Sequence, residues 1–127
     1  MEKIKLGKSG LLVPPIALGC MRLAGAERKQ ADAFLTHCGM NSASEGLYFE
    51  VPLIMYPQTT EQGGVARRVA EVGAGIYLED LSTAGIRKAV EEVLCEEKYR
   101  DKAGKIAASF RRSGGTRRAV DYILKNF

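Results

Sequence analysis

Two consecutive strand, turn and helix patterns between residues 33 and 72 constrain the fold of this chain more than any other feature. In the first, the apolar run from Ala33 to Leu35 leads through a short polar stretch into a helical segment. In the second, the apolar run from Val51 to Tyr56 leads into a helix whose valines form an apolar stripe. Short buried strands that alternate with helices are typical of a parallel sheet covered by helices. The patterns therefore predict an α/β fold, a three-layer, partial Rossmann-like parallel sheet.

Polar residues gather where each of these apolar runs ends. Gly39 permits a tight turn, and Asn41 or Ser42 can cap the helix that follows. The free N–H groups and the dipole at such a helix start favour an anion, so we expect a phosphate there. Open α/β sheets bind ligands at the carboxyl ends of their strands. Glu61 and Gln62, which follow the second run, are therefore expected at the same edge.

The segment HCGMNSASE, followed by VPLIMYPQTTEQ, resembles the donor-sugar signature in the C-terminal lobe of GT-B glycosyltransferases, a family of UDP-sugar-dependent enzymes. The resemblance covers residues 30–127. It implies contacts to the donor diphosphate, one acid that binds the ribose and a pair that binds the sugar hydroxyls. It implies no metal, no cofactor and no catalytic residue in this chain. The implied binding residues are, in that order, His37, Gly39, Asn41 and Ser42, then Glu45, then Glu61 and Gln62.

Two positions inside the signature depart from the family pattern. Met40 stands where plant members usually have Trp, and Glu50 stands where Gly commonly precedes Val-Pro. The larger departure lies before the signature, in residues 1–25.

Residues 1–25 carry a different pattern. Alternating segments around Ile4 and Leu12 predict a β-hairpin, and two prolines then lead into a buried strand at Ile16–Leu18. This segment resembles the start of aldo-keto reductases, where a hairpin precedes the first strand of a barrel. Such a barrel needs about 250 residues, and the chain lacks the reductase catalytic set, so we expect no reductase activity. We interpret the chain as a chimera, natural or engineered, joined near residues 23–30.

This interpretation predicts the order of the strands. The hairpin lies at one side of the sheet, and the strands containing Ile16, Phe34, Leu53 and Ile76 follow in succession. A short crossover helix is expected over residues 26–32. The hairpin covers the outer edge of the Ile16 strand only in part, and exposed edges invite pairing with another chain. A homo-oligomer is therefore predicted.

Three more helices are expected after the strand at residues 75–78. The first is capped by Ser82, the second covers residues 98–112, and Thr116 caps the last. Thr60 is expected to cap the helix that carries Glu61. The apolar residues of the last helix are predicted to pack inward; they are Ala119, Val120, Ile123 and Leu124.

Length, charge and composition narrow the class of protein. The 127 residues are most simply one domain with a modest core. The sequence contains no apolar run of membrane-spanning length and no secretion signal, so we expect a cytoplasmic protein. Three cysteines share no disulfide-like or metal-like spacing. The net charge of +4 comes largely from the end of the chain, where a solvated helix face is expected rather than a nucleic-acid surface.

Three functions are compatible with these patterns. The first is weak binding of a diphosphate or nucleotide sugar without turnover, because the related enzymes draw their catalytic base and acceptor pocket from an N-terminal lobe. The second is a chimeric scaffold that binds no ligand. The third is an active transferase assembled with a separate acceptor lobe.

Overall fold

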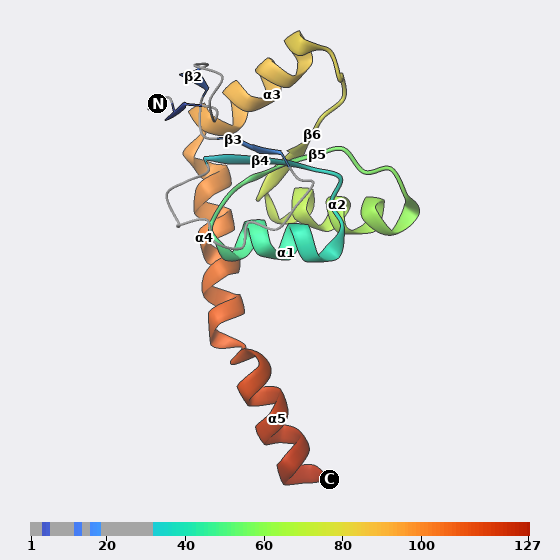
Figure 1. Ribbon diagram of the computed structural model, residues 1–127, viewed down its shortest axis with the longest axis vertical. Coiled ribbons are helices and arrows are strands. Elements are labelled where there is room, and N and C mark those ends of the chain that lie inside the picture. Colours follow the sequence, from blue (N-terminus) through green and yellow to red (C-terminus); the bar gives the residue numbers. More distant parts are fainter. Residues whose placement is uncertain (1–3, 6–11, 14–15, 19–31) are drawn as a thin grey trace.

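Four parallel strands form the central sheet of the protein. The computed structural model describes residues 4–5, 12–13, 16–18 and 32–127 (Figure 1). β3 pairs in parallel with β4, with Ile16 opposite Ala33, so the predicted neighbours are confirmed. The strands follow one another in the order β3 (Ile16–Leu18), β4 (Ala33–Thr36), β5 (Leu53–Met55) and β6 (Gly75–Tyr77).

The N-terminal hairpin forms a small sheet of its own. β1 (Ile4–Lys5) pairs antiparallel with β2 (Leu12–Val13), which confirms the predicted hairpin. Among the described strands, these two pair with each other and are not further strands of the parallel sheet. The crossover helix expected over residues 26–32 falls outside the described residues, except for Asp32.

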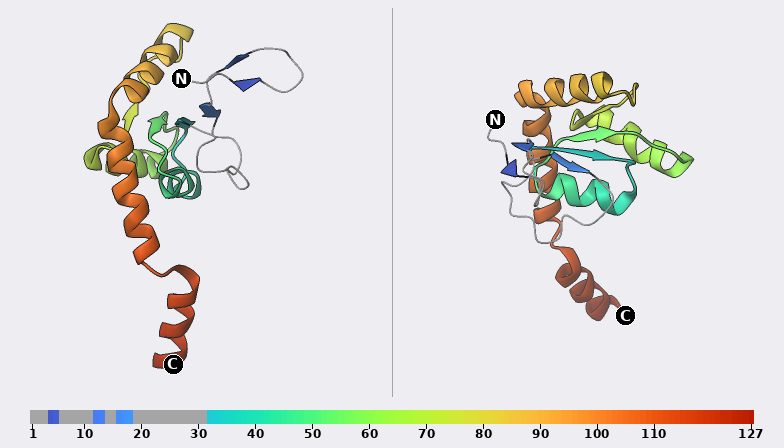
Figure 2. Two further views of the ribbon diagram at one scale, coloured as in Figure 1. Left: turned by 90° about the vertical axis from the view of Figure 1, so that its left-hand side faces the viewer. Right: turned by 45° about the horizontal axis from the view of Figure 1, so that its top comes forward.

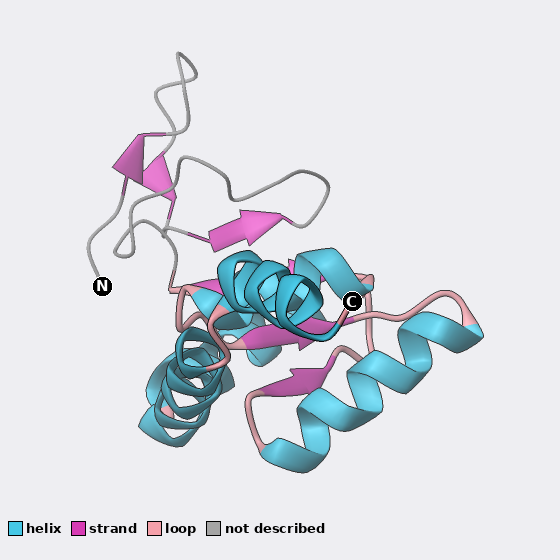
Figure 3. Cartoon of the chain, turned by 90° about the horizontal axis from the view of Figure 1, so that it is seen from below, coloured by secondary structure: helices cyan, strands magenta, loops and turns pink. Residues whose placement is uncertain are grey.

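Helices cover both faces of the sheet and complete three layers (Figures 1 and 3). On one face, Phe34, Leu53 and Met55 are buried against residues of α1, α2 and α4. On the other face, Ala33 and Ile54 are buried against α3 and the start of α4. Successive strand residues face opposite sides, so each short apolar run supplies both cores. The helices are α1 (Met40–Tyr48), α2 (Thr60–Val72), α3 (Thr83–Cys95), α4 (Glu97–Arg112) and α5 (Gly115–Asn126).

Local hydrogen bonds fix the starts of α2 and α3. Ser82 caps α3 as predicted, because its Oγ accepts the N–H of Gly85 at 3.1 Å. Thr59, and not Thr60, caps α2: its Oγ1 accepts the N–H of Gln62 at 3.3 Å. A cap residue needs extended backbone, which Thr59 adopts while Thr60 already belongs to the helix.

The last helix differs from its prediction. α5 begins at Gly115 without a side-chain cap from Thr116, and it projects away from the sheet (Figures 1 and 2). None of its residues is buried; Val120, Ile123 and Leu124 are 46%, 55% and 77% exposed. The prediction that these side chains pack inward is therefore wrong. The apolar stripe exists, but nothing in the described part of the chain covers it.

None of the five helices, all of which lie within residues 32–127, has the length and apolarity needed to span a membrane.

Candidate functional site

The two polar segments of the signature leave the sheet at one edge. β4 and β5 run parallel in register, with Thr36 opposite Met55. The N–H of Tyr56 donates to the carbonyl oxygen of Thr36 at 2.9 Å, so the two strands end side by side. Residues 37–39 and residues 56–59 then lead into α1 and α2. The predicted site residues thus lie after the carboxyl ends of neighbouring strands, where parallel sheets bind ligands.

The start of α1 presents backbone donors that the helix does not use. Gly39 is the cap residue, and its carbonyl oxygen accepts the N–H of Ala43 at 2.9 Å. The N–H groups of Met40, Asn41 and Ser42 precede this first bond, and no side chain from the described residues caps them. The expectation that Asn41 or Ser42 caps α1 is therefore wrong, because both lie inside the helix. A helix start without a side-chain cap leaves its N–H groups available to an anion.

The imidazole of His37 lies against Gly39 at this helix start. A Cβ atom placed on Gly39 would be 3.1 Å from Nε2 of His37 and 3.7 Å from its Cδ2. Glycine at position 39 therefore permits close contact with the His37 ring, whereas a larger residue there would push the ring away. His37 is half-buried at this turn. The ring thus contacts the cap residue of α1, which directly precedes the three N–H groups.

Cys38, between these two residues, is completely buried and does not supply a nucleophile. Burial raises the pKa of its thiol from 9.0 to about 11. The thiol therefore stays protonated at neutral pH. Cys95 is exposed, and Cys20 lies outside the described residues.

The remaining predicted residues lie along the first turns of α1 and α2. Ser42 and Glu45 are half-buried on α1, and Asn41 is exposed. Glu61 is exposed in the first turn of α2. Gln62 is half-buried, and its Oε1 accepts the N–H of Gln58 at 2.8 Å. This bond occupies the carbonyl end of the Gln62 side chain and leaves its NH₂ group to donate.

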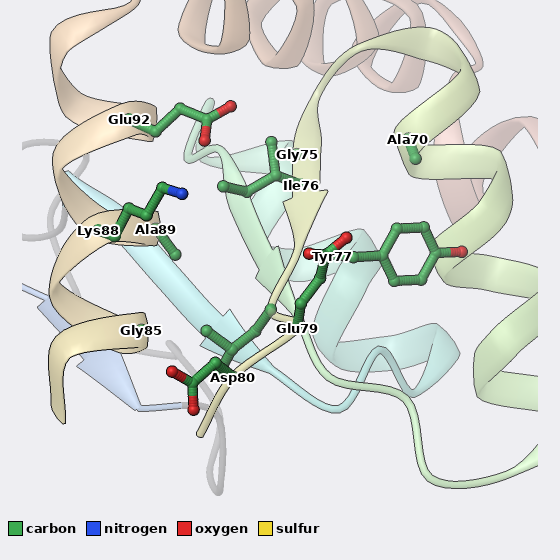
Figure 4. Close-up of a pocket in the computed structure, with 11 residues that line it drawn as sticks. Ala70, Gly75, Ile76, Tyr77, Glu79, Asp80, Gly85, Lys88, Ala89 and Glu92 are labelled. Carbon is green, nitrogen blue, oxygen red and sulfur yellow. The ribbon is translucent and has the colours of Figure 1, made fainter. Parts of the chain in front are cut away.

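A separate hollow of about 520 Å³ lies beside β6, between α2 and α3 (Figure 4). Glu79, Asp80, Lys88 and Glu92 contribute its charges, and none of the predicted site residues lines it. Three carboxylates against one ammonium disfavour a diphosphate there. Among residues 32–127 and the described strands before them, no group of three or more His, Cys, Asp and Glu residues could hold a metal ion.

The fold is that of a Rossmann-like lobe, with the signature residues at the carboxyl ends of β4 and β5. Residues 27–111 match the family model described as UDP-glucoronosyl and UDP-glucosyl transferase. Since this match covers more than half of the chain, the protein belongs to that family.

Known proteins agree with this assignment. The chain is 44% identical over 99 residues to an uncharacterized UDP-glucosyltransferase, YojK, of Bacillus subtilis strain 168, covering 76% of this chain and 24% of the relative. The crystal structure of the glycotransferase of kitacinnamycin matches with a TM-score of 0.75 and 29% identity, over 95% of this chain and 31% of that one. CalG4, the calicheamicin glycosyltransferase, matches with a TM-score of 0.73 and 33% identity, over 77% and 26%. This chain thus spans 24%, about a quarter, of the length of the Bacillus relative.

These findings support the glycosyltransferase part of the sequence interpretation and give no support to a reductase origin of residues 1–25. The family match begins at residue 27. The structural match to the kitacinnamycin enzyme covers 95% of the chain.

Proposed function

We propose that this chain is a donor-binding lobe of a UDP-sugar-dependent glycosyltransferase. The observation that carries the proposal is the start of α1, where the ring of His37 lies against the cap residue Gly39 and three N–H groups without a helical partner follow. Two oxygen-rich phosphates match this combination of backbone donors and imidazole better than any neutral ligand does. The name of the Bacillus relative, a UDP-glucosyltransferase, supports UDP-glucose as the first donor to test.

The residues that follow the carboxyl ends of β4 and β5 then have distinct roles. His37, Gly39, Asn41 and Ser42 hold the diphosphate, and Glu45 accepts hydrogen bonds from the ribose. Glu61 and the NH₂ group of Gln62, at the start of α2, bind the sugar hydroxyls. In sugar transfer the diphosphate leaves with increasing negative charge, which the helix start and the imidazole stabilise. Transfer also needs a base that deprotonates the acceptor, and we propose that this chain alone binds the donor without turnover.

Calorimetric titration with UDP, UDP-glucose and uridine tests the diphosphate site. We expect UDP and UDP-glucose to bind and uridine, which has no phosphate, to bind far more weakly. Replacing His37 with alanine removes one donor to a charged ligand and should weaken UDP binding about tenfold.

Arg118→Ala is the matched control, because it removes a cation from α5 and leaves the edge of the sheet intact. Its affinity for UDP should equal that of the unchanged protein. Equal binding by His37→Ala and the unchanged protein would exclude the proposed role of His37. No heat with any of the three compounds would favour the ligand-free scaffold instead.

Three further properties are proposed. β3 is one of the two terminal strands of the described sheet, and pairing through its outer edge would give the predicted homo-oligomer. A cytoplasmic location fits a donor that is a soluble nucleotide sugar. A separate, reductase-like origin of residues 1–25 is proposed from the sequence resemblance alone.

A further inference from the structure

We propose that Thr36 is a positioning residue whose buried hydroxyl holds the His37 ring at the start of α1. The inference deepens the proposed function and rests on it for the identity of the ligand. The position of the ring, however, is a property of the free protein and can be measured without a ligand.

The backbone of Thr36 is fixed to the sheet, and its side chain faces the core. Its carbonyl oxygen accepts the N–H of Tyr56 at 2.9 Å, and the residue is only 3% exposed. Its Oγ1 accepts the N–H of Cys38 at 3.1 Å. Both residues are buried, so water cannot replace this bond without opening the turn.

Cys38 adopts a backbone conformation that needs such support. Its φ is 67°, in the left-handed region that residues other than glycine rarely occupy. Its side chain is 0% exposed and packs in the core with Phe34 and Leu47. The Thr36 hydroxyl and the buried side chain of Cys38 therefore both stabilise the left-handed backbone conformation of Cys38, next to His37.

The consequence for the site is geometric. With Cys38 held in place, the chain turns so that Gly39 becomes the cap of α1 and the His37 ring approaches it. Without the hydroxyl, the Cys38 N–H is buried and unpaired. Relaxation of Cys38 toward a more common φ then lowers the free energy of the turn. Such a change moves the ring away from the free N–H groups even if the sheet remains intact.

Thr36→Val tests the inference, because valine has nearly the shape of threonine without the acceptor. His37 is the single histidine of the sequence, so its ring gives one unambiguous set of NMR signals. We expect a nuclear Overhauser effect between the Hδ2 proton of His37 and the α protons of Gly39 in the unchanged protein. In Thr36→Val this effect should disappear, and UDP binding should weaken about tenfold. Thr36→Ser keeps the hydroxyl and should restore both.

Ser82→Ala is the control for a loss of stability alone. It removes another hydroxyl that accepts a backbone N–H, at the start of α3, and should preserve both the Overhauser effect and the affinity. If Thr36→Val is folded and keeps both, the inference is overturned and Thr36 is only structural. If Thr36→Val does not fold, Thr36→Ala takes its place with the same two outcomes. Absence of UDP binding in the unchanged protein would refute the proposed function, while the Overhauser effect would still decide the role of Thr36.

Discussion

Replacing Val93 with aspartate should lower the free energy of unfolding by about 4 kcal/mol, because it buries a carboxylate without a partner. Val93 is 3% exposed in the cluster that joins α3 to the sheet. Leu124→Asp makes the same kind of change on α5, where Leu124 is 77% exposed, and should alter stability by less than about 0.5 kcal/mol. Urea unfolding followed by circular dichroism measures both values.

The comparison between these two variants decides where α5 lies. The apolar spacing of the sequence predicts similar losses for both, since it places both side chains in a core. A large loss for Leu124→Asp would therefore show that α5 packs against the rest of the chain in solution.

Replacing Gly75 with alanine should lower the free energy of unfolding by about 3 kcal/mol, because the added methyl group has no space. The new Cβ would overlap the carbonyl oxygen of Leu53 and lie 3.1 Å from its carbonyl carbon. Leu53 is completely buried in the middle of the sheet and cannot move aside without separating β5 from β6. Thermal and urea unfolding should both record the loss.

Gly64→Ala is the matched control for Gly75→Ala. Nothing lies within 4 Å of a Cβ atom at Gly64, which belongs to α2. Alanine there should stabilise the protein by up to about 1 kcal/mol, since glycine is a poor helix former. Equal stability of Gly75→Ala and the unchanged protein would mean that β6 does not pair with β5 as described.

The parallel strands could be predicted in their order along the sheet because each strand is marked by residues within its own short segment. The runs around Phe34 and Leu53 are short, apolar on both faces and followed by turn residues, which is the pattern of a buried parallel strand. Ser82 precedes a helical pattern and caps it as expected. Periodicity shows that α5 has an apolar face, but it does not show what covers that face. The exposure of Leu124 therefore could not be predicted from the sequence.

The positions of the site residues could be predicted better than their interactions. His37 and Gly39 follow β4 as expected, but the bond between Thr36 and Cys38 depends on a left-handed cysteine that no propensity favours. A threonine two residues before a tight turn is the one signal that suggests this bond, through the ST-turn pattern. Likewise, the side chain of Gln62 is a plausible sugar ligand in the sequence, whereas the fold engages its Oε1 with Gln58.

Glu50 shows how a departure from the family pattern is accommodated. Its φ is 63°, in the left-handed region, which gives a physical reason for the glycine that commonly precedes Val-Pro at this position. Its carboxylate lies 3.4 Å from the guanidinium of Arg111 on α4. This contact between loop and helix offsets part of the backbone cost, although a partly exposed ion pair contributes only about 0 to 1 kcal/mol.

An NMR titration of the ¹⁵N-labelled protein with UDP shows whether a diphosphate binds where β4 leads into α1. We expect the amide signals of Met40, Asn41 and Ser42 and the ring signals of His37 to shift most and to saturate together. Uridine should leave them unchanged. If the largest shifts instead fall on the arginines of α4 and α5, or on the residues around Glu79 and Glu92, the diphosphate does not bind at the start of α1.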